Sequence, residues 1–87
     1  MRQLLFFHQQ KCPYCEQAAI WLEELTEENP EFAAVSIRKI DENKESELAD
    51  RYDYWKVPTF FLGEEKLHEG AATKEIIRSV LTRALEG

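Results

Sequence analysis

The sequence contains little glycine, proline, histidine or cysteine, with 3, 3, 2 and 2 residues respectively among 87. It also lacks repeats, low-complexity segments and linkers, so we predict a single domain over residues 1–87. The cysteines are Cys12 and Cys15, and the histidines are His8 and His68. Tetrahedral zinc takes four ligands, and these four residues do not have the spacing of any zinc module. We therefore predict no metal site.

Long apolar runs and an excess of positive charge are also missing. The first apolar run, Leu4-Leu5-Phe6-Phe7, is too short for a secretory signal or a membrane span, so we expect a cytoplasmic protein. The formal net charge of −6 argues against binding to nucleic acid and against docking to an acidic membrane surface. With 44% hydrophobic and 32% charged residues, the chain has the composition of a folded globular protein, which we expect to be a monomer.

Apolar periodicity divides the chain into alternating strands and helices. Strands are predicted at residues 3–8, 34–40, 59–62 and 66–69, and helices at residues 13–28, 45–52 and 74–85. Pro13 opens the first helix, and Thr73 is placed to cap the last. Strands joined by helices imply a parallel pair with a right-handed crossover, and the final hairpin adds antiparallel strands. The predicted fold class is therefore α/β, with a mixed four-stranded sheet in the order strand-helix-strand-helix-strand-strand-helix and with helices on both faces.

The segment Cys12-Pro13-Tyr14-Cys15 lies where the first predicted strand meets the first helix. A helix N-terminus stabilises a thiolate through unpaired N–H groups and the positive end of the dipole, and the thiolate is the nucleophile in thiol–disulfide exchange. Two intervening residues place the second sulfur one turn away and deeper. We therefore predict that Cys12 attacks a disulfide and that Cys15 resolves the mixed disulfide. A structural disulfide is a poor explanation, because closing so short a loop removes little unfolded-state entropy.

Two segments of the sequence also carry a resemblance to a known family. Cys12-Pro13-Tyr14-Cys15 matches the dithiol glutaredoxin motif letter for letter, and Val57-Pro58 matches the cis-proline element of the thioredoxin superfamily. The chain is therefore similar to that superfamily over nearly its whole length, and closest to glutaredoxins at the cysteines. The resemblance implies a thioredoxin-like fold in which Pro58 is cis and lies beside Cys12. It also implies that the Val57 backbone pairs with a bound peptide or glutathione, while Pro13 and Tyr14 line the site.

The second half of the chain departs from the glutaredoxin pattern. Lys56 stands where glutaredoxins usually carry a threonine, and Glu69-Gly70-Ala71 stands where they carry a glycine pair followed by a polar residue and an aspartate. These segments resemble thioredoxins instead. Yet Lys11 stands where thioredoxins have a tryptophan, and apolar residues around Phe6 replace their buried acid. The resemblance therefore implies a hybrid, with a glutaredoxin-like active site on a thioredoxin-like C-terminal half.

Several residues around the cysteines are candidates for substrate binding. They are Lys11, Pro13, Tyr14, Val57, Pro58, Gly70 and Ala71. Backbone N–H groups near Ala71, at the start of the last helix, are suited to receive a carboxylate. Lys11 and Lys56 are hypothesised to attract the carboxylates of glutathione or of an acidic protein, with ordinary solvated lysines as the alternative. Trp55 is a candidate for the edge of the substrate groove, although such aromatic residues more often belong to a core.

The sequence thus predicts a thiol–disulfide oxidoreductase that reduces protein or glutathione mixed disulfides, with roles in electron transport and cell redox homeostasis. No tightly bound cofactor is expected, and glutathione is a candidate co-substrate. The electron donor stays open between glutathione and a thioredoxin-reductase-type flavoprotein. Two alternatives also stay open. One is a non-catalytic adaptor of thioredoxin fold, and the other is an iron–sulfur cluster or metal carrier, against which Cys15 and Pro13 argue.

Overall fold

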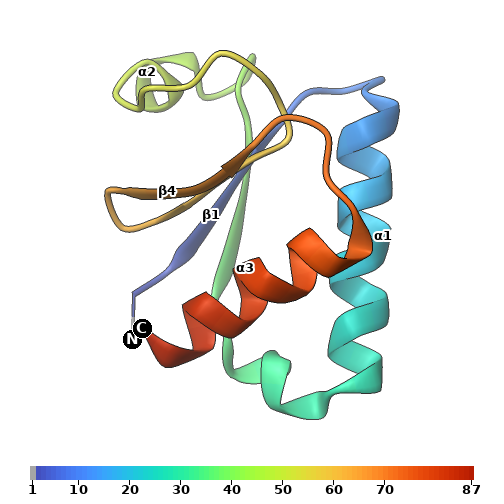
Figure 1. Cartoon of the computed structure of the whole chain (residues 1–87). Coiled ribbons are helices and arrows are strands. Elements are labelled where there is room, and N and C mark those ends of the chain that lie inside the picture. Colours follow the sequence, from blue (N-terminus) through green and yellow to red (C-terminus); the bar gives the residue numbers. More distant parts are fainter. Residues whose placement is uncertain (1) are drawn as a thin grey trace.

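The computed structural model describes residues 2–87, which form four strands, three α-helices and one short 3₁₀ helix (Figure 1). In chain order the elements are β1 (Leu4–His8), α1 (Pro13–Glu28), the 3₁₀ helix η1 (Pro30–Ala34), β2 (Ile37–Asp41), α2 (Ser46–Ala49), β3 (Thr59–Leu62), β4 (Glu65–Glu69) and α3 (Lys74–Glu86). Within these residues, no helix combines the length and the apolar character that crossing a membrane requires.

The strands form one mixed sheet in the order β2-β1-β3-β4. β1 runs parallel to β2 and antiparallel to β3, and the β3–β4 hairpin adds the other edge. In this register Phe7 lies opposite Ile40 on one side and opposite Thr59 on the other, and Thr59 lies opposite Glu69. The C-terminal ends of β1, β2 and β4 therefore meet the N-terminal end of β3 at the same end of the sheet.

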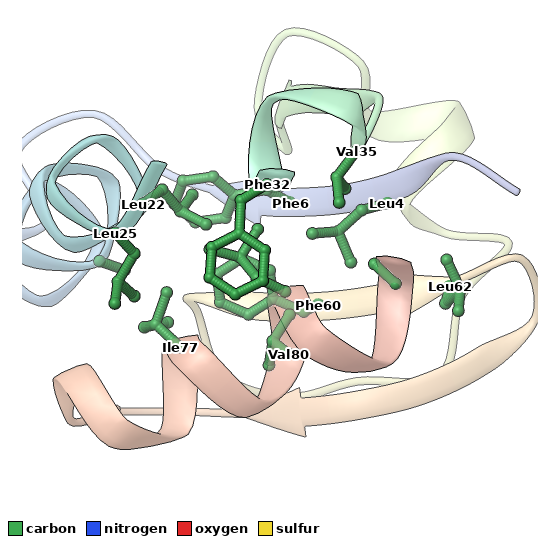
Figure 2. Close-up of a cluster of buried hydrophobic side chains, with 13 residues drawn as sticks. Leu4, Phe6, Leu22, Leu25, Phe32, Val35, Phe60, Leu62, Ile77 and Val80 are labelled. Carbon is green, nitrogen blue, oxygen red and sulfur yellow. The ribbon is translucent and has the colours of Figure 1, made fainter. Parts of the chain in front are cut away.

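The larger hydrophobic core lies between one face of the sheet and the helices α1, η1 and α3 (Figure 2). Phe6 of β1 and Phe60 of β3 stack at its centre, with ring centroids 4.8 Å apart. The helices contribute buried side chains at helical spacing: Ala18, Leu22 and Leu25 from α1, and Ile77, Val80, Leu81 and Ala84 from α3. This packing holds α1, and with it the cysteines at its start, against the sheet.

A second, smaller core lies on the opposite face of the sheet. It is formed by Leu5, Phe7, Ile40, Ala49 and Phe61, with Leu48, Tyr52, Tyr54 and Val57 packed around them. Because successive side chains of a strand point to opposite faces, the continuous apolar run of β1 supplies both cores. The small helix α2 and the segment that follows it cover this face.

The structure confirms the predicted α/β fold, with its mixed sheet and with helices on both faces. The first helix has the predicted bounds, Pro13–Glu28. Thr73 caps α3 as predicted, since its Oγ1 atom accepts a hydrogen bond from the backbone N–H of Ile76 at 3.1 Å. The extent of the domain, 1–87, stays a prediction.

Two predicted elements have the wrong extent. The strand expected at residues 34–40 begins only at Ile37, because Pro30 starts the 3₁₀ helix η1, which the sequence analysis did not predict. The helix expected at residues 45–52 ends at Ala49. From Arg51 onward the backbone bonds span three residues, as from Tyr52 N–H to the Ala49 carbonyl at 3.0 Å, so the chain continues as turns.

Candidate active site

Three connections meet at one end of the sheet (Figure 1). Residues 9–12 join β1 to α1, residues 50–58 join α2 to β3, and residues 70–73 join β4 to α3. The backbone N–H of Gly70 donates to the carbonyl of Pro58 at 2.8 Å, which ties the second connection to the third. The fold therefore brings Cys12, Pro58 and Gly70 to the same end of the molecule, although they are far apart in sequence.

Cys12 is the N-cap residue of α1, and Pro13 occupies the first helical position. Its Sγ atom accepts a hydrogen bond from the backbone N–H of Cys15 at 3.2 Å. Its backbone carbonyl accepts the first helical bond, from Glu16 N–H at 3.0 Å. The half-buried sulfur takes the place that a serine or threonine oxygen takes in an ordinary cap, where the helix dipole favours negative charge.

Cys15 differs sharply from Cys12 in its surroundings. It lies in the first turn of α1 and keeps only 3% of its surface exposed. Burial raises the pKa of the Cys15 thiol to about 12, and the hydrogen bond with Cys12 and the negative charges of Cys12 and Glu42 act in the same direction. Both cysteines are free thiols in the structure. The pair therefore consists of a half-buried cysteine at the helix cap and a buried thiol that stays protonated at neutral pH.

The proline loop, defined here as Trp55–Pro58, precedes β3. The Val57–Pro58 peptide bond is cis, as the resemblance implied, and Pro58 is buried. The hydroxyl of Thr59, which has no exposed surface, donates to the carbonyl of Lys56. Within residues 2–87, neither the N–H nor the C=O of Val57 takes part in a hydrogen bond. The loop thus keeps one residue with two free backbone groups directly beside the cis-proline.

Glu69, which the sequence analysis did not single out, holds the proline loop from the end of β4. Its Oε2 atom accepts hydrogen bonds from the backbone N–H groups of Trp55 at 2.6 Å and of Lys56 at 2.9 Å. Its Oε1 atom pairs with Lys66 Nζ at 2.7 Å. The Lys66 hydrogen bond and then the two backbone donors lower the pKa of Glu69 from its ordinary 4.5 to about 2. The carboxylate is therefore charged at any physiological pH.

Glu42, also missed, follows β2 and lies on the side of Cys15. Its carboxylate accepts hydrogen bonds from the hydroxyl of Tyr54 at 2.7 Å and from the side-chain amide of Gln9. Burial and then the bond to Glu42 raise the pKa of Tyr54. The charge of Glu42 also contributes to the raised pKa of Cys15. The position of this acid directly after a parallel strand was the available sequence signal, because polar groups at such strand ends often line sites.

Of the remaining predicted residues, Lys11, Gly70 and Ala71 lie on these connections, and Tyr14 lies on α1. Lys11 is exposed and has a φ of 58°, the left-handed region, directly before Cys12. Tyr14 is 64% exposed on the first turn of α1. Ala71 is exposed, and Gly70 is buried with a φ of 94°, a conformation that favours glycine. These positions are compatible with substrate binding, which stays a prediction for each of them.

His68 stabilises the connection after β4. Its Nε2 atom lies 3.1 Å from the carbonyl oxygen of Gly70 and 3.0 Å from that of Ala71. Because both oxygens are acceptors, Nε2 carries a proton and donates to them. These contacts give His68 a structural role at the end of β4. Among residues 2–87, no three histidine, cysteine, aspartate or glutamate side chains lie together as a metal site would require.

Comparison with known proteins identifies the family. A model of the thioredoxin-like domain matches residues 1–85, so this chain belongs to the thioredoxin-like domain family. Among curated proteins, no sequence matches. The resemblance to the thioredoxin superfamily is thereby confirmed, and the paired cysteines at a helix N-terminus give the chain the active-site arrangement of thiol–disulfide oxidoreductases.

Solved structures show the same fold. Oxidised thioredoxin from Plasmodium falciparum matches with a TM-score of 0.71 and 17% identity, over 92% of this chain and 77% of that one. A mutant thioredoxin from Halobacterium salinarum NRC-1 matches with a TM-score of 0.69 and 24% identity, over 97% of this chain and 74% of that one. A structure described as a malarial protein has a TM-score of 0.69 and 16% identity, over 94% of both chains. At these identities the likeness concerns the fold, and the glutaredoxin-like specificity stays a prediction.

Proposed function

We propose that this protein is a thiol–disulfide oxidoreductase that reduces disulfides of proteins or mixed disulfides of glutathione. The observation that supports the proposal most strongly is the asymmetry of the cysteine pair. Cys12 caps the helix with a half-buried sulfur, whereas Cys15 is buried and has a pKa of about 12. Cys12 is thus suited to attack an external disulfide, and Cys15 is suited to react only after a mixed disulfide has formed.

The reaction proceeds in two exchanges. The Cys12 thiolate attacks one sulfur of the substrate disulfide, a Cys12–substrate bond forms, and the first substrate thiolate leaves and takes up a proton. Cys15 then loses its proton and attacks the Sγ atom of Cys12. The Cys12–Cys15 disulfide forms, and the second substrate thiolate leaves and is protonated. The substrate disulfide has then gained two electrons, and the protein dithiol has lost the same two electrons.

The proline loop provides the binding edge in this proposal. The free N–H and C=O of Val57 are suited to pair with the backbone of a substrate segment, as an additional strand does at a sheet edge. Pro13, Tyr14, Pro58, Gly70 and Ala71 complete the surroundings of Cys12. No tightly bound cofactor is required, since thiols carry the electrons. A monomer in the cytoplasm, reset by glutathione or by a thioredoxin-reductase-type donor, stays our expectation.

Lys11 and Lys56 form part of the proposal as attractants for anionic substrates. Both are exposed, and within residues 2–87 neither forms an ion pair. Replacement of both by glutamine should raise the KM for glutathionylated substrates. The matched control replaces Lys39 and Lys44, which are also exposed, and changes the net charge equally. Equal KM values in the two double variants would leave Lys11 and Lys56 as ordinary solvated lysines.

The proposed function is tested by following the reduction of bis(2-hydroxyethyl) disulfide in two parallel assays. One assay is driven by glutathione with its reductase and the other by NADPH with thioredoxin reductase. We expect turnover with at least one donor and none in Cys12→Ser. Turnover with glutathione alone would assign the glutaredoxin-like function, and turnover with thioredoxin reductase alone would assign the thioredoxin-like one. An inactive wild-type protein would contradict the proposal and favour an adaptor, and a visible absorption band after anaerobic purification would favour a cluster carrier.

A further inference from the structure

We infer that Trp55 is a docking residue for disulfide-bearing polypeptides and that Glu69 is the positioning residue that holds it in place. This inference rests on the proposed function and adds to it two residues outside the cysteine pair, one that contacts a polypeptide substrate and one that holds the loop carrying it. It depends on the proline loop, on the exposure of Trp55 and on the bonds that Glu69 makes across to that loop.

Trp55 is the most exposed large hydrophobic side chain among residues 2–87. It keeps 90% of its surface exposed, compared with 64% for Tyr14 and 47% for Ile20. The other tryptophan, Trp21, is partly buried against the larger core. An isolated exposed apolar residue is common, but tryptophan is among the residues that most often carry the binding energy of an interface. The position of Trp55, two residues before Val57, makes it continuous with the proposed binding edge.

The backbone of Trp55 is held firmly although its side chain is free. The carboxylate of Glu69 accepts from the N–H groups of Trp55 and Lys56, and Lys66 fixes the other carboxylate oxygen. The same loop is held at Lys56 O by the Thr59 hydroxyl and at Pro58 O by the N–H of Gly70. A loop whose backbone is ordered before binding loses less entropy when a partner docks on it. The tryptophan is therefore presented on a rigid support.

The free backbone groups indicate the kind of partner. The N–H groups of Trp55 and Lys56 and the C=O groups of Lys56 and Pro58 are hydrogen-bonded within the protein, whereas Val57 is the residue of the loop with neither backbone group bonded. An extended polypeptide satisfies both groups and extends along the loop to the indole of Trp55. A small disulfide without a peptide backbone does neither. The expected partner is thus a polypeptide with an apolar or aromatic side chain close to its disulfide, which packs on Trp55.

The test compares a polypeptide substrate with a small one in the intact protein. The rates at which insulin and bis(2-hydroxyethyl) disulfide are reduced are measured for three proteins: wild type, Trp55→Ala and the control Ile20→Ala. The control removes an exposed apolar side chain outside the loop. We expect Trp55→Ala to raise the KM for insulin about thirtyfold, the effect of losing an interface hot spot worth about 2 kcal/mol, with kcat unchanged. Turnover of the small disulfide should stay within about twofold in all three proteins. An unchanged KM for insulin in Trp55→Ala would overturn the inference.

Glu69→Gln tests the positioning role. The amide keeps the size of the side chain but loses the charge that binds two backbone donors and Lys66. We expect a higher KM for insulin, an unchanged kcat and normal reduction of the small disulfide. Glu75→Gln is the matched control, because Glu75 also forms an exposed ion pair three residues along the chain, with Arg78 at 3.4 Å. A KM for insulin equal to that of wild type in Glu69→Gln would remove Glu69 from the inference.

A binding measurement separates this inference from the proposed function. In a Trp21→Phe, Cys12→Ser protein, Trp55 is the only tryptophan and the proposed nucleophile is absent. We expect added insulin to shift the fluorescence emission of Trp55 to shorter wavelength in a saturable manner. The small disulfide should leave the emission of Trp55 unchanged. An inactive wild-type protein, together with the emission shift in the variant, would contradict the proposed function alone. Normal catalysis without the shift would contradict the docking role of Trp55 alone.

Discussion

The Sγ atom of Cys12 accepts a hydrogen bond from the backbone N–H of Cys15 at 3.2 Å, so the two cysteines are connected before any disulfide forms between them. The donor belongs to the backbone, and therefore the bond survives replacement of the Cys15 side chain. The first sulfur remains positioned at the helix N-terminus even when the second is absent. This relationship makes the two halves of the proposed reaction separable by mutation.

Cys15→Ser should accumulate the mixed disulfide on Cys12. The serine hydroxyl cannot displace the bound thiol, while the N–H at position 15 still donates to the Cys12 sulfur. Incubation with oxidised glutathione should yield one covalent adduct per chain in intact-protein mass spectrometry, and a reducing agent should remove it. Cys12→Ser serves as the control and should form no such adduct. A stable adduct on Cys15 of that control would reverse the roles of the two residues.

Alkylation of the native protein should label Cys12 first. Cys15 keeps 3% of its surface exposed, and its pKa is raised to about 12, so at pH 7–9 it is both shielded and protonated. We expect iodoacetamide to modify Cys12 alone in the native state, and both residues after unfolding in urea. Peptide mapping by mass spectrometry measures the two rates. Modification of Cys15 at the rate of Cys12 below pH 9 would contradict the asymmetry on which the proposed function depends.

The hold of Glu69 on the proline loop should be lost only in strong acid. Its pKa is lowered to about 2 in the folded protein from an ordinary value of 4.5. A lowered pKa means that the stabilisation is complete above about 4.5 and disappears as the pH falls through about 2. In Trp21→Phe, the emission of Trp55 should therefore stay constant from pH 7 to about 4 and change as the pH falls toward 2. Trp21→Phe with Glu69→Gln added should not show this change in emission, because it lacks the carboxylate. A change at the same pH in both proteins would show that protonation of Glu69 does not cause it.

Thr73→Ala should destabilise the protein by removing the cap of α3. The Thr73 hydroxyl accepts from the N–H of Ile76 at 3.1 Å, and loss of such a cap typically costs about 1 kcal/mol of unfolding free energy. Urea unfolding followed by circular dichroism measures the difference. Thr82→Ala is the control, because the Thr82 hydroxyl donates only to the carbonyl one turn earlier in the same helix, Arg78 O at 2.8 Å. An equal effect of the two substitutions would argue against the cap.

Phe60→Ala should lower the free energy of unfolding more than Thr73→Ala does. Phe60 has no exposed surface, and its ring stacks on Phe6 at the centre of the larger core. Replacing a buried phenylalanine by alanine costs about 3–5 kcal/mol, because the transfer free energy is lost and a cavity remains. We expect a large fall in Tm by calorimetry, or no cooperative transition. Ile20→Ala, at an exposed position of α1, should leave Tm nearly unchanged.

Much of the fold could be predicted from the sequence because the relevant signals are local. The apolar stripe of α1, the proline at its first position and the threonine that caps α3 act within a few residues of themselves. The run Leu4–Phe7 identified a strand buried on both faces. The predictions failed at the ends of two elements, where a 3₁₀ helix or turns take the place of the expected strand or helix. The helix predicted at residues 45–52 was too long, since turns replace it after Ala49.

The sequence by itself determined the cysteine pair on which the proposed chemistry rests, because the two cysteines and the helix that begins between them are neighbours along the chain. Only the tertiary structure decided what surrounds that pair. Glu69 reaches the backbone of Trp55 across 14 residues, and Tyr54 reaches Glu42 across 12. Such contacts follow from strand pairing and packing and have no periodic signal in the sequence. The sequence alone therefore indicated the two candidate sulfurs, whereas the contacts that Glu42 and Glu69 make became evident only in the folded chain.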